Sequence, residues 1–141
     1  KKLHKGIDIK ASIGTEVIAP SDGVIIDAGF DNGFGFYIEI KHDAAYTTRY
    51  HHLSLITVSK NQSVSKGNII GKVGSSGRST APHLHYEVRV NGIAVDPLYF
   101  ILKSNFFIPS YNSGYSKGII KMINRGSYFF PDFSSNTKVV K

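Results

Sequence analysis

The sequence contains no cysteine among its 141 residues, which excludes both a disulfide framework and a metal site built on thiolates. A zinc site in this chain would therefore have to use histidine and carboxylate ligands, and six histidines are present. No apolar run approaches the roughly 18 residues that a membrane-spanning helix needs. The apolar and charged fractions, 41% and 19%, are typical of a globular domain with a real core.

Acidic residues are scarce at the end of the chain. The formal net charge is +7, and residues 101–141 hold six lysines and arginines against Asp132 alone. A basic tail favours polyanions such as anionic envelope polymers, anionic lipid or nucleic acid, although a tail that only aids solubility is the simpler explanation. Because residues 1–100 are almost neutral, no nucleic acid partner is expected. We predict a domain over residues 1–103 and a basic, aromatic-rich extension over residues 104–141.

The chain starts at Lys1 rather than at a methionine, and its first motif lies within a few residues of that end. We therefore expect it to be part of a longer protein whose first strand and groove are incomplete here. The lack of a signal peptide in this stretch carries no information about localisation.

Short alternating runs, separated by turns rich in glycine and asparagine, predict a compact, mostly antiparallel β structure. Residues 62–71 echo residues 15–26, which suggests two similar hairpins packed against each other. Asn91-Gly92 predicts a tight turn. A short helix is expected near residues 96–102, with Asp96 as its cap. Further strands are predicted within residues 15–30, 36–40 and 46–53.

The stretch Pro82-His83-Leu84-His85-Tyr86-Glu87 alternates as a β-strand, with both histidines and Glu87 on one face. Residues two apart in a strand lie about 6.6 Å apart. At that spacing one imidazole can bind a metal while the other reaches a water molecule. The alternative is a surface strand with two solvated histidines.

Whether His4 and His52 can join such a site depends on the path of the backbone. On a straight strand His4 and Asp8 would lie about 13 Å apart, too far to share one ion, but a bend at Gly6 would let them converge. Alternation over residues 46–53 places His52 on one face and points His51 to the other. We therefore expect a structural role for His51, and the same for His42.

Three ordered motifs now make a specific set: His4-x-x-x-Asp8, then Thr48-Arg-Tyr-His-His52-Leu-Ser54, then Gly77-Arg-Ser-Thr-Ala-Pro-His83-Leu-His85-Tyr-Glu87. From about Leu3 to Phe100 the chain resembles the lysostaphin/LytM-type zinc metallopeptidases of bacterial cell walls. The sequence departs from the family at Ala81, where glycine is usual, and at His51, where a small residue is common.

The resemblance implies Zn²⁺ as cofactor, with His4, Asp8 and His85 as its ligands. It implies that His83 and His52 form a catalytic pair beside the water that zinc activates, and the residues do not decide which of the two takes the proton. The implied fold is an all-β, duplicated-hybrid-motif structure with a groove over the sheet. The implied substrates are peptidoglycan peptides, and the implied location is the cell envelope or outside the cell. The acceptor that orients His85 is not identified, and Glu87 has no assigned role.

Two other classes of protein fit parts of the pattern. A catalytically inactive relative that activates other wall hydrolases should lack ligands, and all five positions are intact here. A biotinyl, lipoyl or phosphohistidine carrier shares paired hairpins, but it would have no use for His4 and Asp8. A zinc measurement separates the carriers from the peptidase, because a phosphocarrier should be free of metal.

Overall fold

The computed structural model describes residues 6–95, and these form nine β-strands and no helix. The all-β prediction is confirmed for this part of the chain. The predicted helix near residues 96–102 and the extension 104–141 lie outside the described residues, as does His4. Residues 6–95 include no helix long and apolar enough to cross a membrane. The strands are β1 (Ile7–Lys10), β2 (Glu16–Ile18), β3 (Gly23–Asp31), β4 (Gly35–Lys41), β5 (Tyr46–Ile56), β6 (Ser63–Val64), β7 (Ile69–Val73), β8 (His83–Val90) and β9 (Ile93–Val95).

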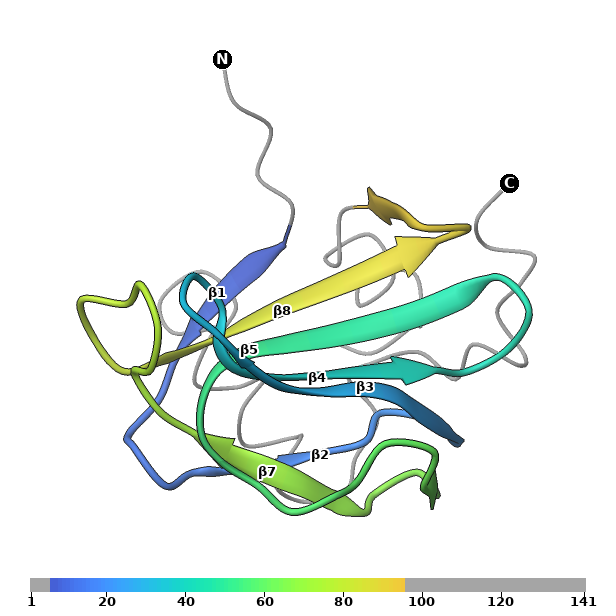
Figure 1. Cartoon of the computed structure of the whole chain (residues 1–141), viewed down its shortest axis with the longest axis horizontal. Coiled ribbons are helices and arrows are strands. Elements are labelled where there is room, and N and C mark those ends of the chain that lie inside the picture. Colours follow the sequence, from blue (N-terminus) through green and yellow to red (C-terminus); the bar gives the residue numbers. More distant parts are fainter. Residues whose placement is uncertain (1–5, 96–141) are drawn as a thin grey trace, which may run out of the picture.

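All the strand pairs are antiparallel, and the main sheet runs in the order β1-β8-β5-β4-β3-β6. The pair β2–β7 is joined to it through β7 and β5, and β9 extends β8. Figure 1 shows β2 and β7 below the layer formed by β8, β5, β4 and β3. The two echoing segments of the sequence do lie side by side, because β2 pairs with β7 and β3 pairs with β6.

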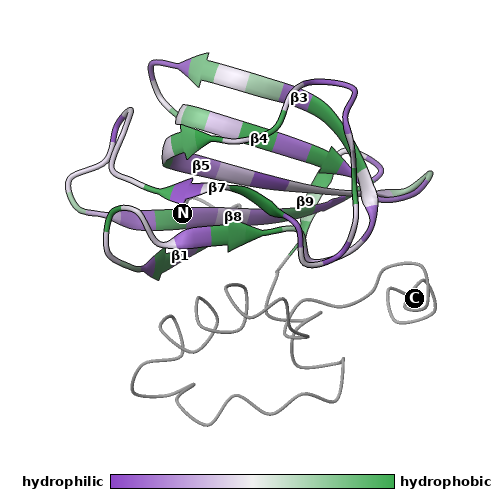
Figure 2. Cartoon of the chain, turned by 90° about the horizontal axis from the view of Figure 1, so that it is seen from below, coloured by the Kyte–Doolittle hydropathy of each residue, from purple (hydrophilic) through white to green (hydrophobic). Residues whose placement is uncertain are grey.

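The core lies on one face of the sheet and is built by strand alternation. In β8, Leu84, Tyr86 and Val88 are fully buried, whereas His83 and His85 are only half-buried on the other face. The predicted faces of this strand are therefore confirmed. Hydrophilic and hydrophobic residues follow one another along the strands in Figure 2. Burying an Ile, Leu or Val side chain stabilises the fold by about 1.5–3 kcal/mol. Fully buried side chains include Ile9, Ile25, Ile38, Ile40, Tyr50, Leu53, Ile70, Val73 and Leu84.

His42 has the structural role expected of it. Its Nδ1 lies 2.8 Å from the Asp22 carbonyl oxygen, and its Nε2 lies 2.8 Å from the Thr48 hydroxyl. That hydroxyl in turn lies 2.7 Å from the phenol of Tyr50 in the core. The ring thus satisfies polar groups at the edge of the core, where unpaired ones would be costly.

β5 contains a bulge at His51–His52. On β4, Ile38 and Phe36 are two residues apart, but their partners on β5, Tyr50 and Leu53, are three apart. His52 has a φ of 64°, and its N–H donates to the Phe34 carbonyl at 2.7 Å. The left-handed conformation costs a residue with a side chain roughly 1–2 kcal/mol. The bulge keeps both Tyr50 and Leu53 in the core and leaves the two histidines on the outer face.

The loop after β7 contacts the turn between β3 and β4 through backbone atoms. Gly35 and Gly77 have φ values of 69° and 72°, and a Cβ on Gly77 would lie 2.3 Å from the Gly35 nitrogen. The Arg78 N–H donates to the Gly33 carbonyl at 3.0 Å. The Ser76 hydroxyl donates to the Leu53 carbonyl and accepts the Phe36 N–H. This loop is therefore anchored beside the bulge in β5.

Replacing Gly77 with alanine should destabilise the fold more than the same change at Gly92. Gly92 lies in the confirmed Asn91-Gly92 turn with a φ of 82° and open space around it, so Gly92→Ala costs only the conformational strain of about 1–2 kcal/mol. Gly77→Ala adds a clash with backbone, and we expect about 1–3 kcal/mol beyond that. Urea unfolding of the two variants measures the difference. Equal losses would show that the loop does not depend on the close backbone contact.

Candidate active site

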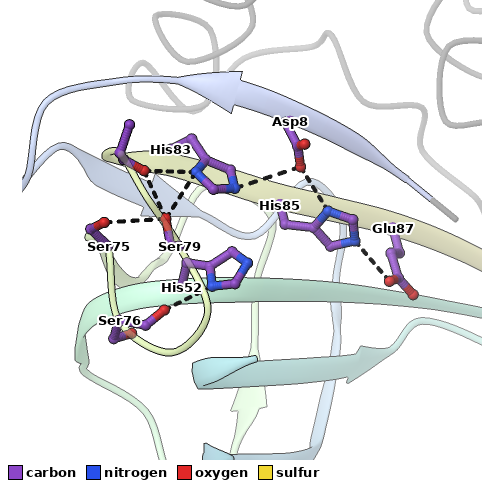
Figure 3. Close-up of polar contacts among 9 residues, drawn as sticks. Asp8, His52, Ser75, Ser76, Ser79, His83, His85 and Glu87 are labelled. Carbon is purple, nitrogen blue, oxygen red and sulfur yellow. Dashed lines mark hydrogen bonds and ion pairs between the residues drawn. The ribbon is translucent and has the colours of Figure 1, made fainter. Parts of the chain in front are cut away.

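Three neighbouring strands bring Asp8, His85 and His51 into one row across the outer face of the sheet. Asp8 on β1 pairs directly with His85 on β8, and His85 pairs with His51 on β5. The Asp8 carboxylate lies 2.8 Å from His85 Nδ1. Figure 3 shows these two side chains facing each other. The Asp8 side chain is 51% exposed, so this end of the row is open to solvent.

The second ring nitrogen of His85 contacts Glu87. His85 Nε2 lies 2.8 Å from a Glu87 oxygen. The other Glu87 oxygen accepts a hydrogen bond of 2.9 Å from Arg89 Nε and forms an ion pair with Arg89 Nη2, also at 2.9 Å. Burial opposes charge on His85, but the hydrogen bonds with Glu87 and Asp8 outweigh it and raise the pKa of the ring. Burial likewise opposes the Glu87 charge, yet hydrogen bonds with His85 and Arg89 lower its pKa to about 2. Glu87 is therefore the hydrogen-bond acceptor for His85 that the sequence alone does not identify.

His83 lies next to this pair. Its Nε2 is 3.7 Å from the Asp8 carboxylate, and its Nδ1 lies 2.8 Å from the Ala81 carbonyl oxygen and 3.2 Å from the Ser79 hydroxyl. A carbonyl can only accept, so Nδ1 carries the proton and donates it. In the neutral ring, Nε2 is then the atom that can take up a proton.

His52 approaches from the bulge in β5. Its ring centroid lies 4.8 Å from that of His83 and 6.3 Å from that of His85. Its Nδ1 donates to the Ser76 carbonyl at 2.8 Å, which again leaves Nε2 as the proton-accepting atom (Figure 3). Burial lowers the pKa of His52, the Ser76 hydrogen bond opposes that effect, and the neighbouring His83 and His85 rings reinforce it. The ring is therefore neutral near pH 7.

His51 does not point away from His52, so the prediction from strand alternation is wrong. The bulge breaks the alternation, and the His51 and His52 ring centroids lie 6.1 Å apart. His51 is 3% exposed and stacks on His85 with centroids 4.8 Å apart. Burial, together with the His85 charge, lowers the pKa of His51 to about 3.

Two groups of side chains in this site have the chemistry to hold a metal ion. Ligand atoms of His51, His85 and Glu87 lie within 4.8 Å of one another. That group is largely buried, and its carboxylate is already paired with Arg89. The pair Asp8–His85 instead has converged donor atoms beside open solvent. A catalytic zinc needs an open coordination position, so the pair Asp8–His85 fits such an ion better.

The chain matches known proteins over the same region. The profile of peptidase family M23 matches residues 2–97. The DD-carboxypeptidase/endopeptidase Mpg of Neisseria meningitidis serogroup B is 47% identical over 97 residues, which are 69% of this chain and 22% of that protein. The peptidoglycan DD-endopeptidase ShyC of Vibrio cholerae is 42% identical over 96 residues, 68% of this chain and 22% of that protein. The lysostaphin catalytic domain of Staphylococcus simulans matches with a TM-score of 0.67 and 44% identity, covering 72% of this chain and 80% of that one.

The sheet is that of a lysostaphin-type metallopeptidase domain. The chain belongs to peptidase family M23. The resemblance stated from the three motifs is thereby confirmed. The chain spans about a fifth of the length of the curated relatives it matches.

The structure brings together four of the five predicted site residues: Asp8, His52, His83 and His85. It adds Glu87, which is on the predicted face of β8, and His51, whose predicted direction is wrong. Gly6 has a close contact that the sequence does not reveal, since a Cβ there would lie 2.3 Å from the Tyr86 carbonyl oxygen. The convergence of His4 on Asp8 stays a prediction.

The Glu87 carboxylate should stabilise the metal-free fold in a pH-dependent way. Its folded pKa of about 2 lies below the ordinary 4.5, so its contribution is present above the ordinary value and disappears as the pH falls through the folded one. The stability difference between wild type and Glu87→Gln should therefore be large at about pH 5 and shrink towards about pH 2. Urea unfolding with a chelator present measures it.

The exposed Glu16 at the start of β2 provides the matched control. Glu16→Gln should change the stability little at either pH, because an exposed carboxylate gains little on folding. A Glu87→Gln difference that stays constant with pH would contradict the low pKa.

Proposed function

We propose that this chain carries a zinc-dependent endopeptidase domain that hydrolyses peptide bonds in bacterial peptidoglycan. The observation that carries the proposal is the direct pairing of Asp8 with His85, with His83 and His52 gathered beside it. Family membership and the names of the relatives supply the substrate class. An endopeptidase of this class acts in the cell envelope or outside the cell, where peptidoglycan is found.

Asp8 and His85, together with His4, would hold the zinc ion. One carboxylate and two imidazoles form a typical three-ligand set for catalytic zinc. The bound ion supplies Lewis acidity, which polarises the scissile carbonyl and lets water attack near neutral pH. Glu87 fixes the orientation of His85 through Nε2, and the Glu87–Arg89 ion pair keeps that carboxylate in place.

His83 and His52 would move the protons. Each ring has its Nδ1 proton bound to a backbone carbonyl, so each presents Nε2 to the space beside Asp8 and His85. A neutral ring there can take a proton from water. Once protonated, the same nitrogen can donate to the oxyanion or to the leaving amine. Both rings would have this capacity, and the lowered pKa of His52 supports its role as a proton acceptor.

The relatives also favour one type of bond. Mpg and ShyC are named as acting on D,D-linked peptides, and both are more than 40% identical to this chain. We therefore propose the D-alanyl cross-link to a diamino acid as the preferred substrate over glycine-rich bridges.

Digestion of purified cell walls tests the activity. Walls with direct D-alanyl cross-links and walls with glycine bridges are each incubated with the zinc-loaded protein, and the released peptides are identified by mass spectrometry. Cleavage of the directly cross-linked wall is expected. Cleavage of the glycine-bridged wall alone would reverse the bond assignment, and cleavage of neither would refute the enzyme.

Two alanine substitutions should separate metal binding from proton transfer. His85→Ala should lose zinc and activity together, because it removes a ligand. His83→Ala should keep zinc and lose about 10²–10⁴-fold in kcat, the usual contribution of a positioned acid or base. Zinc content by atomic absorption and the rate of cross-link cleavage measure the two effects.

His42→Ala is the matched control, because this histidine bonds to Asp22 and Thr48 and takes no part in the site. It should keep both zinc and activity. Loss of zinc from His83→Ala would mean that His83, and not only His85, is a ligand.

A further inference from the structure

Three rings are stacked at the buried end of the site. The Phe34 and His51 rings lie 4.3 Å apart with an interplanar angle of 18°, and the His51 and His85 rings lie 4.8 Å apart at 23°. Phe34 comes from the turn before β4, whereas the two histidines are cross-strand partners on β5 and β8. His51 is thus held between an aromatic face and the ring of the metal-site histidine.

Hydrogen bonding does not explain why His51 is there. Within residues 6–95 its buried Nε2 has no hydrogen-bond partner. A buried polar atom without a partner costs about 1–3 kcal/mol. His51 makes its ring contacts through its two flat faces, with Phe34 on one side and His85 on the other.

That face supplies a restraint that the hydrogen bonds of His85 do not. Asp8 and Glu87 each hold one ring nitrogen of His85, at 2.8 Å in both cases. Two such contacts leave the ring free to tilt about the line that joins them. A ring stacked on the face of His85 opposes that tilt, and Phe34 prevents His51 from giving way.

We propose that His51 is a positioning residue, whose ring, backed by Phe34, fixes the tilt of His85 and so strengthens zinc binding at the Asp8–His85 site. The inference rests on the proposed zinc site. It assigns the effect to the flat ring and not to its nitrogen, so phenylalanine should replace His51 and an aliphatic side chain should not.

Zinc affinity of the full chain tests this, measured by competition with a chromophoric chelator in wild type, His51→Phe and His51→Leu. His51→Leu fills a similar volume without a flat face and should bind zinc about 10-fold more weakly, the lower end of the range for residues that orient metal ligands. His51→Phe should stay within about 3-fold of wild type. Phe34→Leu, at the partly exposed turn, should lose a few-fold and does not disturb the core.

Co²⁺ in place of zinc adds a spectroscopic measurement, because its visible absorption depends on ligand geometry. The His51→Phe spectrum should match that of wild type, and the His51→Leu spectrum should differ. A role in stability alone would lower the melting temperature of His51→Leu but leave the metal affinity and the spectrum of the folded protein unchanged.

Each of the other outcomes would contradict either the positioning role of His51 or the proposed zinc site. If His51→Leu and Phe34→Leu bind zinc as tightly as wild type, the positioning role is wrong and the zinc site stands. If His51→Phe loses as much affinity as His51→Leu, the ring nitrogen is what matters, and His51 acts as a ligand. If wild type itself binds no zinc, the proposed function and this inference both fail.

Discussion

The site depends on one irregularity, the bulge at His51–His52 in β5. Up to His51 this strand pairs with β8, and from Leu53 onward it pairs with β7. A regular strand could not serve both partners and also keep Tyr50 and Leu53 in the core. The extra residue resolves the conflict, at the cost of a left-handed backbone at His52. Two adjacent histidines are thereby placed on the same face, which a regular strand forbids.

The register of the strand pairs determines which other side chains of the site become neighbours. Asp8, His85 and His51 are neighbours only because β1 and β5 each pair with β8 in the observed alignment. A slip of one residue in either pair would turn the side chains to the opposite face. The alternating core residues of β8 prevent such a slip, since Leu84, Tyr86 and Val88 would then have to leave the core. Packing on one face of the sheet therefore fixes the chemistry on the other.

This division explains what the sequence could and could not reveal. The faces of β8, the Asn91-Gly92 turn and the all-β class follow from periodicity and turn chemistry, and they are confirmed. The predicted direction of the His51 side chain is wrong because it assumes regular alternation along β5. A bulge adds a residue to that strand without a clear compositional signal in the sequence. The partners of His52 and His83 are the carbonyls of Ser76 and Ala81, and backbone acceptors are not encoded in residue type. The predicted face of Glu87 is correct, but residue spacing alone does not predict its hydrogen bond with His85.

The two carboxylates of the site have different tasks because their surroundings differ. Glu87 is 3% exposed and paired with Arg89, so its charge is balanced inside the protein whether or not His85 is protonated. It can therefore serve as a constant acceptor for one ring nitrogen. Asp8 is half exposed and faces His85 and His83. Its charge favours a cation at that end of the row, such as a protonated histidine. In the proposed zinc site, Glu87 would orient His85 and Asp8 would bind the ion.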